Sequence, residues 1–240
     1  MTRWQALLRP LQGLMSAIAE RMAPTHWKQF NELHYWKRRK SIEGTLSNDH
    51  YEYFYTKCFG LEATAYVGKV VLDIGCGPRG SLEWADMALR RIGVDPLANE
   101  YLALGAKAHR MQYLPAPAEN IPIGDSACDI VASFNSLDHV ANVERVIAEM
   151  KRIARAGGTL LLMVEVNHPP TACEPHELSP DKLLSWLAPE FVCTAIEVVK
   201  PAGSGGIYES VLSGAKVDRA FWATARGFLV ASFSREQPNV

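Results

Sequence analysis

The sequence lacks the features that would mark a membrane-spanning, metal-ribbon or nucleic-acid-binding protein. No run of 18 apolar residues occurs, so no membrane-spanning helix is predicted. The five cysteines include no C-x-x-C pair, which disfavours a zinc ribbon or an iron–sulfur site. Their odd number disfavours a secreted disulfide framework, so we expect a cytoplasmic protein. With 25 basic against 26 acidic residues, no nucleic-acid partner is expected.

The N-terminal segment has an amphipathic pattern. In residues 1–22, apolar side chains from Trp4 to Met22 recur every three or four positions, which predicts a helix. We expect this helix to pack on the core or to cap a cleft, and a weak contact with a membrane surface is the alternative. Residues 1–66 as a whole are expected to form an aromatic-rich helical cap on a second unit, residues 67–240.

From residue 69 onward, short β-branched runs alternate with helical patterns. Strands are predicted over 69–74, 91–94, 112–114, 129–134 and 159–166, and helices over 82–89, 99–108 and 143–154. This alternation predicts an α/β fold with a doubly wound, Rossmann-like, mostly parallel sheet. A helix over 180–187 then precedes two strands, 191–199 and 227–234. Because no clear crossover helix separates these strands, we expect an antiparallel hairpin at one edge.

The segment VVLDIGCGPRG, residues 70–80, is the most informative part of the chain. A buried strand leads directly into Gly75 and Gly77, and glycines let a ligand lie against backbone N–H groups. Asp95 ends the next strand, where a carboxylate can bind ribose hydroxyls. The spacing also matches a dinucleotide-binding loop, so that interpretation stays open. Asp73, however, would repel a diphosphate and would suit a cationic amino-acid group.

Four segments follow one another in a recognisable order. They are LDIGCG at 72–77, GVDP at 93–96, AENIP with DSACDIVAS at 118–133, and RIARAGGTLLL at 152–162. Together they resemble class I S-adenosylmethionine-dependent methyltransferases, particularly the small bacterial type 11 enzymes related to ubiquinone and menaquinone methyltransferases. The resemblance covers about residues 69–167 and strengthens the prediction of a Rossmann-like fold.

The resemblance implies that the chain is an enzyme with S-adenosylmethionine as its cofactor. The expected reaction is methyl transfer to an oxygen or nitrogen atom of a small molecule or of a glycan- or lipid-linked intermediate. Two alternatives remain open at this point. One is an NAD-dependent oxidoreductase that uses the same glycine loop, and the other is a non-catalytic cofactor-binding or partner subunit.

The resemblance also implies a set of cofactor-binding residues. They are Asp73, Gly75, Cys76, Gly77, Asp95, Pro96, Ala118, Glu119, Asn135 and Ser136. The chain departs from the family pattern in two places. Arg79 stands where the family often has the last glycine of Gly-x-Gly-x-Gly, and Pro117 replaces an aspartate that reaches adenine. Adenine recognition is therefore expected from Glu119 or from the backbone of Ala118.

The candidate catalytic residues follow the fourth and fifth strands. His139 is the candidate general base, because neutral imidazole is available near neutral pH. The alternative is a packing histidine at a helix start, with Asp138 as the N-cap. Polar side chains also crowd the segment after the fifth strand: Glu165, Asn167, His168, Glu174 and His176. Of these, Glu165 and His176 are further catalytic candidates. The acidic pattern is incomplete for a metal site, so none is predicted.

Overall fold

The computed structural model describes residues 24–204 and 206–237. The amphipathic N-terminal segment lies outside the described residues, and so does its predicted role as a capping or membrane-surface helix. Among the residues described, no helix combines the length and the apolar character needed to cross a bilayer.

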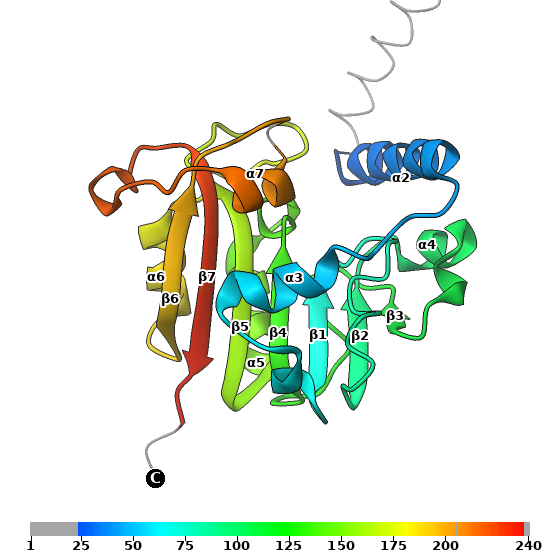
Figure 1. Cartoon of the computed structure of the whole chain (residues 1–240), viewed down its shortest axis with the longest axis horizontal. Coiled ribbons are helices and arrows are strands. Elements are labelled where there is room, and N and C mark those ends of the chain that lie inside the picture. Colours follow the sequence, from blue (N-terminus) through cyan, green and yellow to red (C-terminus); the bar gives the residue numbers. More distant parts are fainter. Residues whose placement is uncertain (1–23, 205, 238–240) are drawn as a thin grey trace, which may run out of the picture.

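A seven-stranded sheet forms the centre of the molecule, in the order β3-β2-β1-β4-β5-β7-β6 (Figure 1). The strands are β1 (Val70–Ile74), β2 (Arg90–Val94), β3 (Gln112–Leu114), β4 (Cys128–Phe134), β5 (Ala154–Val166), β6 (Phe191–Val199) and β7 (Gly227–Arg235). Strands β1 to β5 pair in parallel, whereas β7 is antiparallel to both β5 and β6. The predicted doubly wound sheet with an antiparallel edge pair is confirmed.

Helices cover both faces of the sheet and its carboxyl edge. The α-helices are α2 (Pro24–Glu43), α3 (Tyr51–Tyr55), α4 (Ala98–Leu104), α5 (Val143–Ile153), α6 (Pro180–Leu187) and α7 (Ile207–Ser213). The short 3₁₀ turns are η1 (Lys57–Phe59), η2 (Ala63–Tyr66), η3 (Ala106–Ala108), η4 (Leu137–His139) and η5 (Arg219–Phe221).

Two apolar clusters, one on each face of the sheet, form the core. The side chains of α5 and α6 pack on one face, while those of α3, α4 and α7 pack on the other. Neighbouring residues of one strand supply opposite clusters, as Val71 and Leu72 do in β1. Burial on both faces explains why the parallel strands are almost continuously apolar in the sequence.

The helix predicted over residues 82–89 is absent, and a series of turns takes its place. Hydrogen bonds there span three residues, from Glu83 N to Gly80 O and from Ala85 N to Leu82 O. The side chains of Leu82 and Ala85 are nevertheless fully buried, so the apolar pattern reflects burial rather than helical periodicity. As a result, no helix N-terminus follows the glycine loop. A second difference is the short helix α7, which lies between β6 and β7.

Helix α2 lies across the end of the sheet toward which β1, β2 and β4 point (Figure 1). The Lys40 ammonium donates a hydrogen bond to the Leu104 carbonyl at the end of α4. The Tyr101 hydroxyl donates to Glu32 Oε1 at 2.8 Å. Since ligands of doubly wound sheets bind at the carboxyl ends of the strands, α2 covers the region where a ligand is expected.

Candidate functional site

The loops after β1 and β4 touch at Gly75. The φ angle of Gly75 is +75°, and a Cβ atom built there would lie 2.3 Å from Ser136 Cβ. Ser136 Oγ donates a hydrogen bond of 2.8 Å to the Ile74 carbonyl, which holds the two loops together. Strands β1 and β4 flank the point where the strand order reverses, so this contact marks the crevice in which such sheets bind ligands.

Asp95 lies just beyond β2 and faces the glycine turn. Its Oδ2 accepts a hydrogen bond from Gly77 N at 3.2 Å, and its Oδ1 accepts one from Leu97 N at 2.9 Å. The side chain is 4% exposed. Burial raises the pKa of Asp95 to about 7, and the negative charge of Glu32 adds to the effect. Its negative charge is therefore poorly compensated.

Asp73, in β1, is buried still more completely, with 2% of its surface exposed. Ser81 Oγ donates to its Oδ2 at 2.5 Å, and the Tyr55 hydroxyl forms a second hydrogen bond. Burial raises the pKa of Asp73 to about 7, although both hydrogen bonds act in the opposite direction. Within the described ranges, no lysine, arginine or histidine forms an ion pair or a hydrogen bond with Asp73 or Asp95, and the largest influences on both pKa values include no basic side chain.

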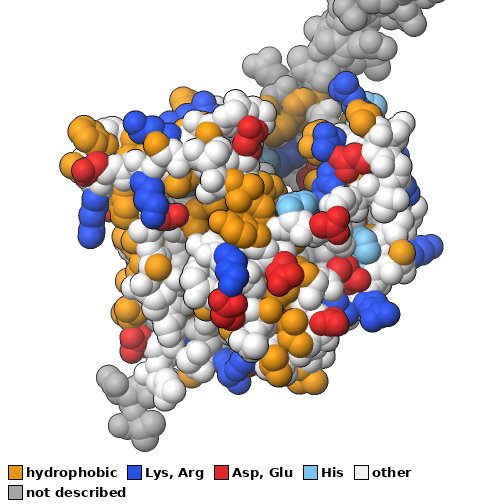
Figure 2. Space-filling model, viewed as in Figure 1, with side chains coloured by type: hydrophobic (Ala, Val, Ile, Leu, Met, Phe, Trp, Pro, Cys, Tyr) orange, Lys and Arg blue, Asp and Glu red, His pale blue; other side chains and the backbone are white. Residues whose placement is uncertain are grey.

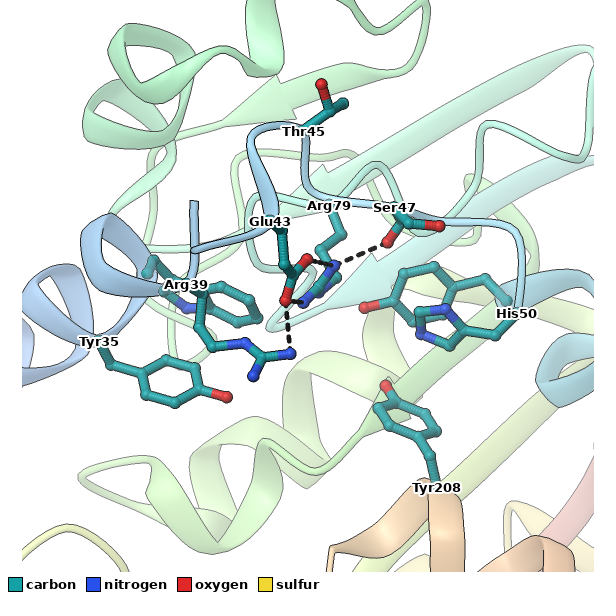
Figure 3. A pocket seen from close by; sticks show the side chains of 10 residues that line it. Tyr35, Arg39, Glu43, Thr45, Ser47, His50, Arg79 and Tyr208 are labelled. Carbon is teal, nitrogen blue, oxygen red and sulfur yellow. Dashed lines mark hydrogen bonds and ion pairs between the residues drawn. The ribbon is translucent and has the colours of Figure 1, made fainter. Parts of the chain in front are cut away.

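A pocket of about 690 Å³ opens between α2, the glycine turn and α7 (Figures 2 and 3). Arg79 forms its inner wall and holds Glu43 of α2 with two parallel hydrogen bonds of 2.8 Å. Arg79 Nη1 also donates to the Ser47 carbonyl at 2.9 Å, and the guanidinium lies 5.5 Å from the centroid of the Trp36 ring. Tyr208 of α7 points toward the same space (Figure 3). Arg79, the departure from the family glycine pattern, thus ties α2 to the turn.

Three other residues predicted to bind the cofactor, Cys76, Pro96 and Asn135, lie in or beside the loops that follow β1, β2 and β4. Cys76 is buried, and a Cβ at Gly93 would lie 2.5 Å from its Sγ, so Cys76 fills the space above Gly93. Pro96 is exposed beside Asp95. Asn135 is exposed and has a φ of +52°, and its N–H donates to the Met163 carbonyl at 2.8 Å.

Glu119 holds the backbone just before α5. Its Oε1 accepts hydrogen bonds from Ala141 N at 2.7 Å and from Asn142 N at 3.0 Å. Adenine recognition by Glu119 or by the backbone of Ala118 stays a prediction.

The three predicted catalytic residues lie in different environments. Glu165 Oε1 accepts from Arg226 Nε at 2.5 Å, so its charge is already paired. His176 Nε2 donates to the Val140 carbonyl at 2.8 Å, which fixes this imidazole to the backbone before α5. His139 has a buried ring nitrogen, Nε2, with no hydrogen-bond partner among the described residues.

The alternative in which Asp138 is the N-cap of a helix beginning near His139 is wrong. The N-cap of α5 is Asn142, whose side chain accepts from Arg145 N, and not Asp138. Asp138 is instead 1% exposed and lies close to His139, His168 and Glu174. A sequence signal for this cluster was available. Acidic and histidine residues follow two parallel strands, and the carboxyl ends of neighbouring parallel strands lie at the same edge of a sheet.

The site as a whole suits a ligand with a positive charge near Asp73 and hydroxyl groups near Asp95. Two buried carboxylates without basic partners attract a cation and accept hydrogen bonds from a diol. A diphosphate would meet the same negative charges. It would also lack the helix N-terminus that normally binds it, because turns follow the glycine loop.

Comparisons with known proteins agree with the fold. Residues 72–162 match a family model described as a methyltransferase domain. An uncharacterized methyltransferase of Mycobacteroides abscessus is 34% identical over 129 residues, 51% of this chain and 50% of that protein. One from Mycolicibacterium vanbaalenii is 30% identical over 176 residues, 72% of this chain and 67% of that protein. The chain thus spans half to two thirds of these curated relatives.

Among solved structures, the fold is similar to that of geranyl diphosphate C-methyltransferase from Streptomyces coelicolor A3(2), in complex with Mg²⁺, geranyl diphosphate and S-adenosyl-L-homocysteine. The TM-score is 0.53 at 16% sequence identity, and the match covers 72% of this chain and 76% of that one. At this level of identity the likeness supports the fold.

The contact at Gly75 predicts a large effect of one added methyl group. Gly75→Ala should lower the free energy of unfolding by more than about 2 kcal/mol, because it combines a strained φ with overlap on Ser136. Gly124→Ala is the matched control, since its added Cβ would meet no atom within 4 Å. Urea unfolding of both variants measures the difference. Equal stabilities would show that the two loops do not require this close approach.

Proposed function

The chain belongs to the family of proteins with a methyltransferase domain, and we propose that it transfers a methyl group from S-adenosylmethionine to an oxygen or nitrogen atom. The acceptor we propose is a small molecule or a glycan- or lipid-linked intermediate. The carrying observation is the pair of buried carboxylates, Asp73 and Asp95, on either side of the glycine turn. The amino-acid end of the cofactor carries an ammonium group and its ribose carries a diol, and these two groups match the two carboxylates.

S-adenosylmethionine supplies a methyl group already activated by a positively charged sulfur. The protein then needs to hold two molecules in line and to exclude water. Asp73 would bind the amino-acid end, and Asp95 would accept hydrogen bonds from the ribose. Gly75 lets the loop after β4 approach the glycine turn, so the cofactor and the acceptor would lie close together. The Arg79–Glu43 pair would keep α2 over the site and so limit the entry of water.

His139 is the residue that we propose acts on the acceptor side. It follows β4 in η4, next to Ser136 on the loop that touches the glycine turn. An oxygen or nitrogen acceptor loses a proton when it gains the methyl group, so a group that stabilises the deprotonated acceptor accelerates the reaction. Asp138 and Glu174 lie within 4 Å of the His139 ring, so we expect the three side chains to act on the acceptor together.

The two alternative functions predict different ligands. An NAD-dependent oxidoreductase requires a diphosphate beside Asp73 and Asp95, which their burial without basic partners opposes. A non-catalytic subunit would bind the cofactor and transfer nothing. Binding and transfer experiments separate these alternatives from the proposed function.

Calorimetric titration should detect binding of S-adenosylhomocysteine and no binding of NAD. Asp95→Asn should weaken S-adenosylhomocysteine binding by about 10-fold or more, because a hydrogen bond to a charged group contributes about 1.5–3 kcal/mol. Asp86→Asn, an exposed position in the turns before β2, is the matched control and should bind like the wild type. Tight NAD binding, or an unchanged affinity in Asp95→Asn, would contradict the proposal.

The raised pKa of Asp73 predicts that cofactor affinity depends on pH. The carboxyl group ionises as the pH rises through about 7, and only the ionised form attracts a cationic group. The affinity for S-adenosylhomocysteine should therefore increase between about pH 6 and about pH 8. The Asp73→Asn variant keeps a hydrogen-bonding oxygen but loses the charge. It should therefore bind S-adenosylhomocysteine weakly, with a smaller pH dependence. A wild-type affinity that falls over this range would rule out the role of Asp73.

Transfer of labelled methyl groups to a mixture of small hydroxy and amino compounds tests the acceptor side. Wild-type protein should label products, whereas His139→Gln should label them at least about 100-fold more slowly while binding S-adenosylhomocysteine normally. His34→Gln, on the exposed face of α2, is the control and should behave like the wild type. Labelling by His139→Gln at the wild-type rate would exclude His139, and no labelling by any variant would favour the non-catalytic alternative.

A further inference from the structure

Four titratable side chains form a ring beyond the ends of β4 and β5. His139 Nε2 lies 3.9 Å from Asp138 Oδ1 and 3.8 Å from Glu174 Oε1. His168 Nε2 lies 3.9 Å from Asp138 Oδ2 and 4.0 Å from Glu174 Oε2. Imidazoles and carboxylates therefore alternate around a common centre. We call Asp138, His139, His168 and Glu174 the His–carboxylate ring.

Three of the atoms that face this centre lack hydrogen bonds, whereas Glu174 Oε2 accepts one from Thr171 Oγ1 at 3.2 Å. Asp138 Oδ1, His139 Nε2 and His168 Nε2 are buried and have no partner among the described residues. Asp138 is 1% exposed and His168 is 2% exposed, so water does not compensate these two side chains freely. The separations across the ring, 3.8–4.0 Å, are too long for hydrogen bonds. Buried polar atoms nearly always have a hydrogen-bond or metal partner. We therefore infer that these three atoms bind a partner that the protein itself does not supply.

The hydrogen bonding of His168 shows what kind of partner is missing. Its Nδ1 lies 2.7 Å from the Pro169 carbonyl oxygen. Because a carbonyl oxygen only accepts, Nδ1 carries the hydrogen, and Nε2 of the neutral ring directs a lone pair at the carboxylates. Lone pairs and negative oxygens repel one another unless a cation lies between them. Metal-binding histidines commonly donate their second ring N–H to a backbone carbonyl in this way.

The distances fit a small cation at the centre. Ligand atoms about 2.1 Å from a tetrahedral ion lie about 3.4 Å from one another. Asp138, His139 and Glu174 each offer one such atom within 4.8 Å of the other two. His168 faces the second oxygen of each carboxylate, and its two separations would have to shorten by about half an ångström for it to join the site. Lys28 interacts electrostatically with Asp138 and Glu174, but its ammonium donates a hydrogen bond to the His139 carbonyl oxygen. Its hydrogen bond therefore leaves the three unpartnered atoms of the ring unpaired.

We propose that the His–carboxylate ring binds a divalent transition-metal ion of the Zn²⁺ type. Two imidazole nitrogens disfavour Mg²⁺ and Ca²⁺, which prefer oxygen ligands, and two carboxylates disfavour the softer Cu⁺. Asp138, His139 and Glu174 lie close enough together to share one ion, and His168 is the fourth candidate ligand, which gives the number that zinc takes. This site was not predicted from the sequence, because the segment after β5 supplies only His168 and Glu174. Asp138 and His139 complete it from the segment after β4.

The proposed ion would lie on the acceptor side of the site. His139 then serves as a metal ligand in place of the general base predicted from the sequence. The metal proposal does not depend on methyl transfer, because metal binding is measured without cofactor or acceptor. S-adenosylhomocysteine binding remains a separate measurement for the proposed function.

Metal binding should be tested on full-length protein without an affinity tag, after removal of metals with a chelator. Calorimetric titration with Zn²⁺ should give one ion per chain. Titration with Co²⁺ should produce the visible d–d absorption of a tetrahedral site, which a nonspecific surface ion does not give. A wild-type protein that binds neither ion at stoichiometric amounts would overturn the proposal.

Variants of the ring provide the second test. His168→Ala should weaken Zn²⁺ binding by at least about 10-fold, since losing even an outer-sphere partner costs that much. Glu174→Gln is a second variant that is less demanding on folding, because its side chain is 31% exposed. His34→Ala removes an exposed histidine of α2 and should bind like the wild type. Wild-type affinity in folded Glu174→Gln and His168→Ala would show that the ions bind elsewhere.

Discussion

Asp73 and Asp95 end neighbouring strands of one parallel sheet, and each is almost completely buried without a basic partner among the described residues. Burying a carboxylate in this way is costly, and here burial raises the pKa of both groups to about 7. A ligand that carries a positive charge and hydroxyl groups would compensate these charges, so its binding would be favoured over that of an anionic ligand. The glycine turn, the cover by α2 and the proposed cofactor all depend on this arrangement.

The carboxyl edge of the sheet contains two chemically different regions. The region near β1 and β2 has the two buried carboxylates, for which we propose an ammonium group and a ribose diol as ligands. The region beyond β4 and β5 has the His–carboxylate ring. The contact between Gly75 and Ser136 joins them, since it brings the two loops together. A cofactor on one side and an acceptor on the other would therefore meet where the two loops touch.

Local sequence signals predicted the strands well, but they did not predict the buried turns at residues 82–89 or the side chains whose partners are distant in the chain. The strands from β1 to β7 appear close to their predicted positions, because apolar runs between glycines and charges are local signals. Residues 82–89 carry an apolar pattern that resembles a helix, yet they form buried turns. Glu119 and Glu165 looked available for ligands, but distant backbone amides and Arg226 engage them.

The sequence by itself determined the succession of strands along the chain, the glycine turn and the position of the two aspartates, because these depend on residues near one another in the chain. Only the tertiary structure decided which side chains stand together. Arg79 binds Glu43 across 36 positions, and His139 meets Glu174 through the meeting of two strand ends. Such pairs arise when the sheet brings parallel strand ends to one edge, and no local pattern specifies them.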